Sequence, residues 1–249
     1  MLGIGKGGFP LGSFALPILI LIWPDQAGAA RQVVAFMLPL LCAMDLVSVA
    51  FYRKYILWRM LAPLVPGILV GVTVASFLFV SDSTFLLSVS DRLLKLLIGL
   101  LSAVFVVFQV ATRFIPKKSD VSSAAANPGP IRSWISGVAA GIVSTISHSA
   151  GPIVIMYFVP QRPGKLGLAG TIAGFAWGLN LVKLIPFGLL GRLETGNLLL
   201  AAWTAPVIPL GVGAGFLLVK ILKERHYFGL VYGGLMVTAV LLIRKAIIG

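Results

Sequence analysis

The chain has 249 residues, of which 59% are hydrophobic and 11% are charged, and its mean hydropathy is +1.04. Charged residues make up about a quarter of a soluble domain, so this composition excludes a soluble globular protein. The formal net charge of +13 would suit a nucleic-acid-binding protein, but the Lys and Arg residues lie mostly at the ends of apolar stretches. Topology signals that face an anionic membrane leaflet have this distribution. We therefore expect an all-α, multi-pass protein of the lipid bilayer, with no nucleic acid among its partners.

An α-helix crosses the bilayer with about 20 predominantly apolar residues, and several stretches of the chain meet this requirement. Two further apolar stretches, Leu2–Trp23 and Trp134–Val159, are interrupted by Gly, Ser and Pro. The polar segment 116–130 is predicted to be a cytoplasmic linker between a first transmembrane repeat, 1–115, and a second, 131–249. In chain order, the predicted spanning helices are Val33–Phe51, Met60–Val80, Leu93–Ala111, Leu168–Leu190, Leu198–Leu218 and Tyr227–Ile243.

The two halves of the chain repeat each other. Pro17 aligns with Pro152, and at the same offset Asp45 falls on Asn180. An Ala-Pro-x-x-Pro segment and a final apolar helix then follow in the same order in each half. Several matches in one order indicate a duplicated unit.

The start of the chain differs from its counterpart in the second half. The first apolar stretch lacks a basic leader and a small-residue cleavage site, so no cleavable signal is predicted. At the offset that aligns the prolines, the position matching Trp134 falls before Met1. The first hairpin is therefore expected to lack most of its descending arm.

Charged loops predict that the halves are inverted. In the first half the loop Arg53–Arg59 is basic and the next loop, Ser81–Asp91, carries only acidic residues. In the second half the order is reversed, because Gly191–Asn197 is nearly neutral and Lys220–His226 is basic. By the positive-inside rule, matching loops then lie on opposite sides of the membrane. Each half is accordingly predicted to be a re-entrant broken-helix hairpin followed by three transmembrane helices.

Other loops bear on the same prediction. The linker and the loop with Arg162 and Lys165 would be cytoplasmic, and both are basic. Arg244 and Lys245 would lie outside, against the rule. The alternative is eight full crossings with parallel halves, which would leave Lys220–Arg225 outside.

Two broken segments, Gly3–Pro10 and Ser144–Gly151, suggest where an anion could bind. Non-helical backbone at membrane depth must be buried in protein or line a wet cavity. Each break precedes a half-helix opened by a proline, and helix N-termini present free amides and partial positive charge to an anion. Lys6 and His148 lie in these breaks and add donors. Alternatively, Lys6 reaches a membrane surface, His148 is a structural imidazole, and the neighbouring serines cap the half-helix.

Polar residues recur inside the second helix of each half. Asp45 with Ser48, and Asn180 with Lys183, are pairs that share a helix face. The repeat superposes the two pairs and would bring them to a common centre. Asp45 is a proton-coupling candidate, because burial favours the neutral form of a carboxyl group. The alternative is a structural ion pair of Asp45 with Lys183 or Lys6.

Three segments resemble the TauE/SafE family of sulfite-exporter-type transporters: G-I-G-K-G-G-F-P-L-G-S-F-A-L-P-I-L-I-L, W-R-M-L-A-P-L-V-P-G-I-L-V-G and L-L-K-L-L-I-G-L. The resemblance covers nearly the whole chain. It implies an inverted repeat and a secondary transporter, often an exporter, of sulfite, sulfoacetate and related sulfonates. Gly5, Gly7, Gly8 and Pro17 match the motif. Lys6 stands where the family commonly has glycine, and Ser147-His148-Ser149 replaces a glycine-rich stretch, so the choice of substrate stays open.

The predicted function is export of a small sulfur-containing anion by alternating access, with a passive anion channel as the alternative. No nucleophile–base pair is spaced for catalysis, and His148 and His226 lie far apart, so neither an enzyme nor a metal site nor a cofactor is expected. The protein would work as a monomer or homodimer in a bacterial inner membrane. The predicted substrate-binding residues are Gly5, Lys6, Gly7, Gly8, Phe9, Pro17, Ser147, His148, Ser149, Gly151, Pro152, Asn180 and Lys183.

Overall fold

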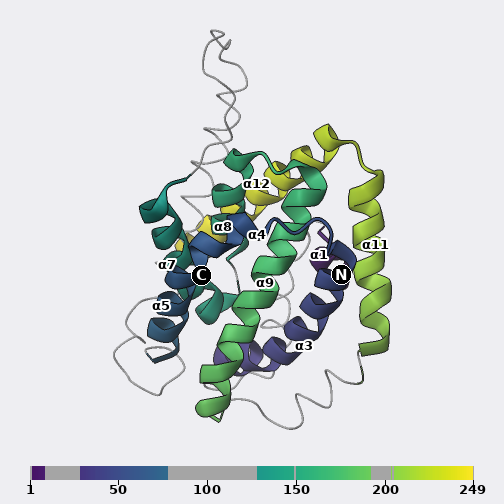
Figure 1. Cartoon of the computed structure of the whole chain (residues 1–249). Coiled ribbons are helices and arrows are strands. Elements are labelled where there is room, and N and C mark those ends of the chain that lie inside the picture. Colours follow the sequence, from purple (N-terminus) through teal and green to yellow (C-terminus); the bar gives the residue numbers. More distant parts are fainter. Residues whose placement is uncertain are drawn as a thin grey trace.

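The computed structural model describes residues 2–8, 29–77, 128–148, 150–191, 203 and 205–248, and within these ranges every regular element is a helix (Figure 1). Short 3-10 turns follow or precede some of the helices: η2 (Ala62–Leu64), η5 (Val159–Gln161) and η6 (Ala205–Val207). The α-helices are α1 (Leu2–Lys6), α3 (Ala29–Tyr52), α4 (Trp58–Leu61), α5 (Val65–Ala75), α7 (Pro130–Ser147), α8 (Gly151–Phe158), α9 (Gly164–Leu189), α11 (Ile208–Ile221) and α12 (Glu224–Ile248).

Most predicted spans coincide with observed helices. The second part of the predicted helix Leu198–Leu218 lies in α11, which begins at Ile208 and continues to Ile221, while residues 198–202 and 204 lie outside the described residues. Prolines explain this start, because Pro206 lies in η6 and Pro209 in the first turn of α11, where a missing amide hydrogen is tolerated. The predicted span Leu93–Ala111 lies outside the described residues. The spans that coincide are Val33–Phe51 with α3, Met60–Val80 with α4 and α5, Leu168–Leu190 with α9, and Tyr227–Ile243 with α12.

Helices α5 and α7 touch through glycines. A Cβ at Gly71 would collide with the backbone of Val138, and one at Gly137 would lie 3.1 Å from the Cα of Gly67. Small residues at such a crossing allow two backbones to approach closely, which is how helices gain packing energy in lipid. The same stretch of α7 cannot accept a side chain at Gly141 either, because the backbone of α5 is too near.

Helices α1 and α11 touch in the same way. A Cβ at Gly3 would lie 3.1 Å from the Cα of Gly211, and one at Gly7 would lie 2.6 Å from the Cα of Gly215. The glycine-rich start of the chain therefore packs as a helix against another helix from near the end of the sequence.

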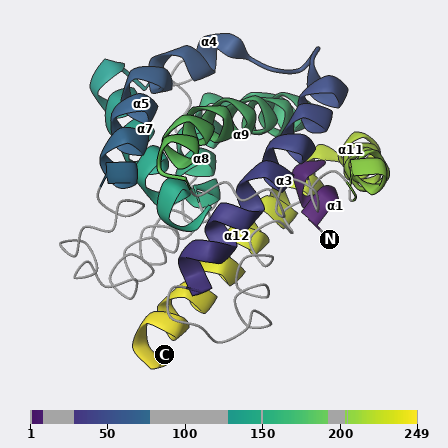
Figure 2. The same cartoon turned by 90° about the horizontal axis from the view of Figure 1, so that it is seen from below.

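Helices α3 and α9 form the centre of the structure and pack against each other. Figure 2 shows α9 with the pair α5 and α7 on one side and α1, α3 and α11 on the other. Two further pairs of contacts match each other: α11 contacts α3 as α5 contacts α9, and α1 contacts α3 as α7 contacts α9.

The outward faces of the helices are apolar. Two helical stretches, Trp58–Ala75 and Gly164–Leu189, are long and apolar enough to cross a membrane by length and composition. Exposed large apolar side chains on this scale mark contact with a partner or with lipid. They include Val65, Leu69, Val70 and Val74 on α5, Leu210, Leu217, Leu218 and Ile221 on α11, and Val237, Val240 and Leu241 on α12.

Tyr52 joins α3 to the turn after α1. Its fully buried hydroxyl donates to the carbonyl oxygen of Gly7 at 2.6 Å, and its ring lies edge-on to Phe216 at 5.0 Å between centroids. We expect Tyr52→Phe to keep the ring contact and lose the hydrogen bond, which lowers the free energy of unfolding by about 1 kcal/mol. The melting midpoint of the purified protein in detergent measures this. Tyr55→Phe is the control, because the Tyr55 hydroxyl has no hydrogen bond within the described part of the chain; an equal fall in both variants would contradict the prediction.

Candidate functional site

Helices α7 and α8 form a broken hairpin whose turn is at His148. Helix α7 ends there because His148 adopts a left-handed conformation, with φ of 49°, and its amide donates to the carbonyl of Ser144. The break is shorter than the sequence predicts, since Ser144 to Ser147 are helical. Thr145 explains part of this: its hydroxyl donates to the Gly141 carbonyl one turn back, at 2.8 Å, which is compatible with a helix.

Helix α8 begins at Gly151 with Pro152 in its first turn, as the sequence predicts. Gly151 is exposed, and Pro152 is buried. The N-cap residue is Ala150, and among the described residues no side chain caps this helix through a hydrogen bond. The alternative in which Ser144 or Thr145 caps the half-helix is therefore wrong.

The first predicted break is also shorter than expected. Residues Gly3 to Lys6, including Gly5, belong to helix α1, and the turn comes at Gly7 and Gly8. Gly7 is packed against α11, and Gly8 has φ of +95°, a backbone conformation that favours glycine. The absence of side chains on this face lets α1 lie against α11, so the glycines here serve packing. The predicted site residues Phe9, Pro17 and Ser149 lie outside the described residues, as does the side chain of Ser147.

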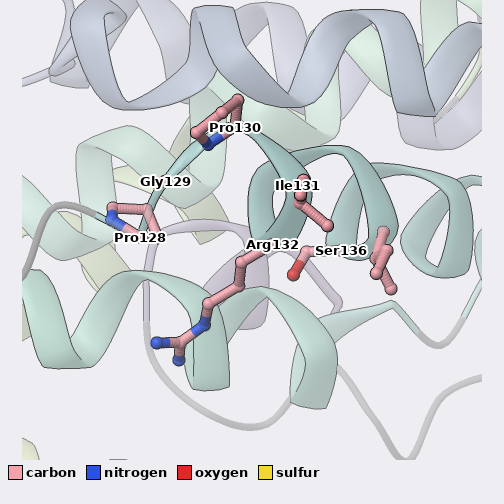
Figure 3. Close-up of a pocket in the computed structure, with 7 residues that line it drawn as sticks. Pro128, Gly129, Pro130, Ile131, Arg132 and Ser136 are labelled. Atoms are coloured by element: carbon pink, nitrogen blue, oxygen red, sulfur yellow. The ribbon is translucent and has the colours of Figure 1, made fainter.

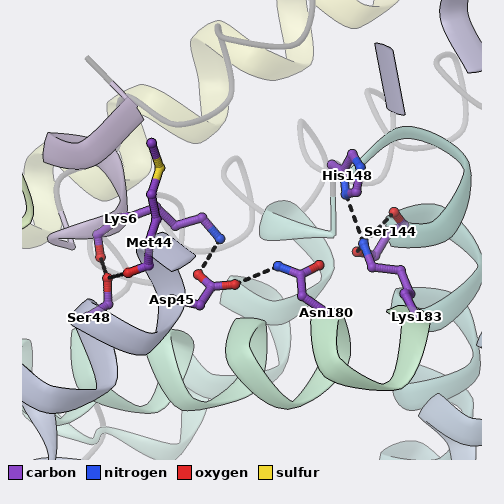
Figure 4. Close-up of polar contacts among 8 residues, drawn as sticks. All are labelled: Lys6, Met44, Asp45, Ser48, Ser144, His148, Asn180 and Lys183. Atoms are coloured by element: carbon purple, nitrogen blue, oxygen red, sulfur yellow. Dashed lines mark hydrogen bonds and ion pairs between the residues drawn. The ribbon is translucent and has the colours of Figure 1, made fainter. Parts of the chain in front are cut away.

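Asp45 is the centre of a first polar group (Figure 4). Its carboxylate accepts from the Lys6 ammonium at 2.5 Å and from the Asn180 amide at 2.5 Å. Asp45 is fully buried, while the Lys6 side chain keeps 20% of its exposure. Ser48 completes the group, because its hydroxyl lies 2.9 Å from the carbonyl oxygens of Lys6 and Met44. These contacts tie α1, α3 and α9 together.

Lys183 is the centre of a second polar group, one turn further along α9 (Figure 4). Its side chain is fully buried. The ammonium lies 3.1 Å from both the carbonyl oxygen and the hydroxyl of Ser144, and 2.8 Å from Nδ1 of His148. The group therefore joins α9 to the end of α7.

The predicted polar residues thus lie together at one centre. Asn180 and Lys183, one turn apart, link the two groups, and the alignment of Asp45 with Asn180 brings those two residues into contact. Of the two ion pairs that the sequence left open, the structure has Lys6 with Asp45, and Lys183 is not paired with Asp45. Sequence reasoning missed the contact of Lys183 with Ser144. Ser144 lies in a different helix, and the alignment of the two halves gives no indication that these two residues meet.

A pocket of about 470 Å³ lies away from this centre, at the start of α7 (Figure 3). None of the predicted site residues lines it. Within the described ranges, no three His, Cys, Asp or Glu residues gather where they could hold a metal ion. The residues around the pocket are Pro128, Gly129, Pro130, Ile131, Arg132, Ile135 and Ser136.

Apolar outward faces around a buried, charged centre define an α-helical integral membrane protein with a polar interior. The chain matches the family described as Sulfite exporter TauE/SafE over residues 4–242 and belongs to that family, which confirms the resemblance seen in the sequence. The family is one of membrane transporters for sulfur-containing anions. No curated protein and no solved structure matches the chain.

Proposed function

We propose that this protein is a secondary transporter that exports a small sulfur-containing anion, such as sulfite, sulfoacetate or a similar sulfonate, by alternating access. One observation carries the proposal: the buried Lys183 amino group lies at a helix break, and within the described residues it contacts Ser144 and His148. Ionisable residues at membrane depth mark substrate and ion pathways, and transporters build their sites where broken helices meet. Lys6, Asn180 and His148 complete the binding residues, and Asp45 is the proton-coupling candidate.

Many secondary transporters are built from two related halves that move against each other, and the helix contacts support a two-fold relation between the halves of this chain. The glycine contact of α5 with α7 is matched by that of α11 with α1. If α1, α3 and α5 correspond to α7, α9 and α11, the contacts of α11 with α3 and of α1 with α3 also have their counterparts, in α5 with α9 and α7 with α9. A pseudo-two-fold axis would therefore pass between α3 and α9, beside the polar centre.

The basic loops support inversion of the halves over the parallel alternative. Lys165 donates to the carbonyl oxygens of Lys220 and Leu222, so the loop after α8 lies beside the loop after α11. The loop after α3 also lies at this end of α9, because the Leu57 amide donates to the Thr171 hydroxyl at 3.1 Å. Inverted halves put these three loops on the cytoplasmic side together, whereas eight full crossings would separate them.

The α7–α8 hairpin supports a re-entrant segment. The Ser133 hydroxyl at the start of α7 lies 2.8 Å from the Tyr157 hydroxyl at the end of α8. The two ends of the hairpin are thus adjacent, and its turn at His148 reaches the buried Lys183. A segment that enters and leaves on the same side has this geometry.

Single-cysteine labelling tests the topology. With Cys42 replaced by serine, we expect Lys54→Cys, Lys165→Cys and Lys223→Cys to react with a membrane-impermeant maleimide only from the cytoplasmic side, because their loops lie together. Labelling of intact cells and of inside-out vesicles provides the two arms. Reaction of both Lys165→Cys and Lys223→Cys in intact cells, with Lys54→Cys protected, would support eight full crossings with parallel halves instead.

Flux into proteoliposomes tests the function. Labelled sulfite and sulfoacetate are supplied with and without a pH gradient, and saturable uptake is expected for at least one of them. A non-saturating, voltage-driven current would support the channel alternative. The absence of flux for every sulfur oxyanion would overturn the proposed transport function. Stimulation by a pH gradient that disappears in Asp45→Asn supports proton coupling at Asp45.

A further inference from the structure

Two basic side chains meet at the break between α7 and α8. Nζ of Lys183 lies 2.8 Å from Nδ1 of His148, so one of the two nitrogens donates a proton and the other accepts it (Figure 4). A charged amine has no lone pair, and neither has Nδ1 of a charged imidazole. While this contact is made, at most one of the two groups is therefore charged, whichever tautomer His148 adopts.

The contact is separate from the ion pair at the polar centre. Nζ of Lys183 also lies 3.1 Å from the carbonyl oxygen and from the hydroxyl of Ser144, in the last turn of α7. Among the described residues, the other titratable groups that act on Lys183 are Lys6, on α1, and Asp45 and Cys42, on α3. Lys6 and Asp45 pair with each other at 2.5 Å. The two nitrogens at the helix break are therefore a second place where a proton can bind.

A bound oxyanion changes how many protons the two nitrogens can hold. An ionised oxyanion only accepts hydrogen bonds, so each nitrogen can donate to it instead of to the other. Its negative charge also offsets the repulsion between two neighbouring cations. Both groups can then be charged, which requires one proton more than the direct contact between them allows.

The helix break leaves room for such a ligand. Gly151, the first residue of α8, is exposed, and a Cβ there would meet no heavy atom of the described residues within 4 Å. His148 is partly exposed, whereas Lys183 is fully buried. An anion can therefore reach the two nitrogens from the turn of the hairpin.

We infer that Lys183 and His148 link anion binding to proton binding: without an anion they share a proton in their direct contact, and the anion is bound together with one further proton. The step takes this proton from water, forms one N–H bond and breaks only the hydrogen bond between the two nitrogens. The inference rests on the proposed function and adds to it a proton site other than Asp45. In alternating access, the proton would cross the membrane in the same direction as the anion.

Proton uptake by the purified full chain in lipid nanodiscs tests the inference, with sulfoacetate and methanesulfonate as probes. Neither probe gains a proton near pH 7.5, because a carboxyl group ionises near pH 4 and a sulfonic acid lower still. Calorimetric titration in two buffers with different ionisation enthalpies counts the protons bound with each anion. We expect about half a proton to one proton per anion near pH 7.5, and a Kd that falls about three- to tenfold when the pH is lowered by one unit.

Two histidine variants show where the proton binds. His148→Gln removes the titrating ring but keeps a side chain that can accept from Lys183 and donate to an anion, so it should bind the probes without proton uptake. His226→Gln is the matched control, because the other histidine of the chain is exposed on α12; its proton uptake should equal that of the unchanged protein. Uptake that is kept in His148→Gln and lost in Asp45→Asn would overturn the inference.

A spectroscopic measurement serves if His148→Gln does not give a monodisperse elution profile. In the His226→Gln protein, His148 is the remaining histidine, so nitrogen-15 NMR of histidine-labelled protein reports on its ring alone. With saturating methanesulfonate near pH 7.5, we expect both ring nitrogens to be protonated. A ring nitrogen that stays unprotonated under these conditions contradicts the inference.

The two proposals fail in different ways. Binding of either probe to the unchanged protein without proton uptake overturns the link between anion and proton, and leaves anion transport standing. No binding and no flux of any sulfur oxyanion overturns the proposed function, and with it this inference.

Discussion

Replacing Asp45 with leucine is expected to lower the free energy of unfolding by about 3–5 kcal/mol, which is typical when one partner of a buried ion pair is removed. The carboxylate accepts from both Lys6 and Asn180, so the substitution leaves an ammonium and an amide without their acceptor at the centre of the structure. Transport should be lost together with stability. The melting midpoint in detergent, followed by size-exclusion elution, measures the first effect.

Asp45→Asn provides the matched control for this prediction. It removes the charge but keeps an oxygen that can accept from Asn180, so its loss of stability should be clearly smaller. An Asp45→Leu protein that melts at the temperature of the unchanged protein would show that the ion pair contributes nothing to folding.

A valine at Gly71 is expected to separate α5 from α7 and to lower the free energy of unfolding by about 1–3 kcal/mol or more. The new side chain would collide with the backbone of Val138, which cannot move without shifting the whole of α7. Because α7 carries Ser144 and His148, the partners of Lys183, transport should fall with stability.

Gly178→Val is the control for the predicted effect of Gly71→Val on the contact between α5 and α7. Gly178 lies inside α9, and a Cβ there would meet nothing within 4 Å. The same substitution should therefore change the melting midpoint little beyond the small effect of helix propensity. A similar fall in both variants would contradict close packing as the reason for the effect at Gly71.

The polar centre could be predicted from the sequence in part, because residues three positions apart on a helix share a face wherever that helix is placed. The alignment of the two halves alone predicts that the pair Asp45 and Ser48 lies near the pair Asn180 and Lys183. In the structure, Asp45 and Asn180 are in contact. Which lysine pairs with Asp45 could not be predicted, since that choice depends on how α1 lies against α3.

The ends of the helices and the contacts of the glycines were harder to predict from the sequence, because they also depend on how the chain packs. The start of the break at His148 depends on local side-chain hydrogen bonds such as that of Thr145, which is compatible with a continued helix. The close approach at Gly67 and Gly71 depends on a partner helix far away in the chain. Glycines in an apolar segment indicate packing or a break equally well until the partner is known.

The contact between α1 and α11 has a consequence for how the chain is assembled in the membrane. Gly3 and Gly7 can meet their partners, Gly211 and Gly215, only after the chain has been synthesised through α11. During insertion α1 must therefore remain in lipid, or in contact with another segment of the chain, until α11 is present. Docking of α1 on α11 should therefore be a late step of biogenesis, and Lys6 would reach Asp45 at that step, so the polar centre would close late.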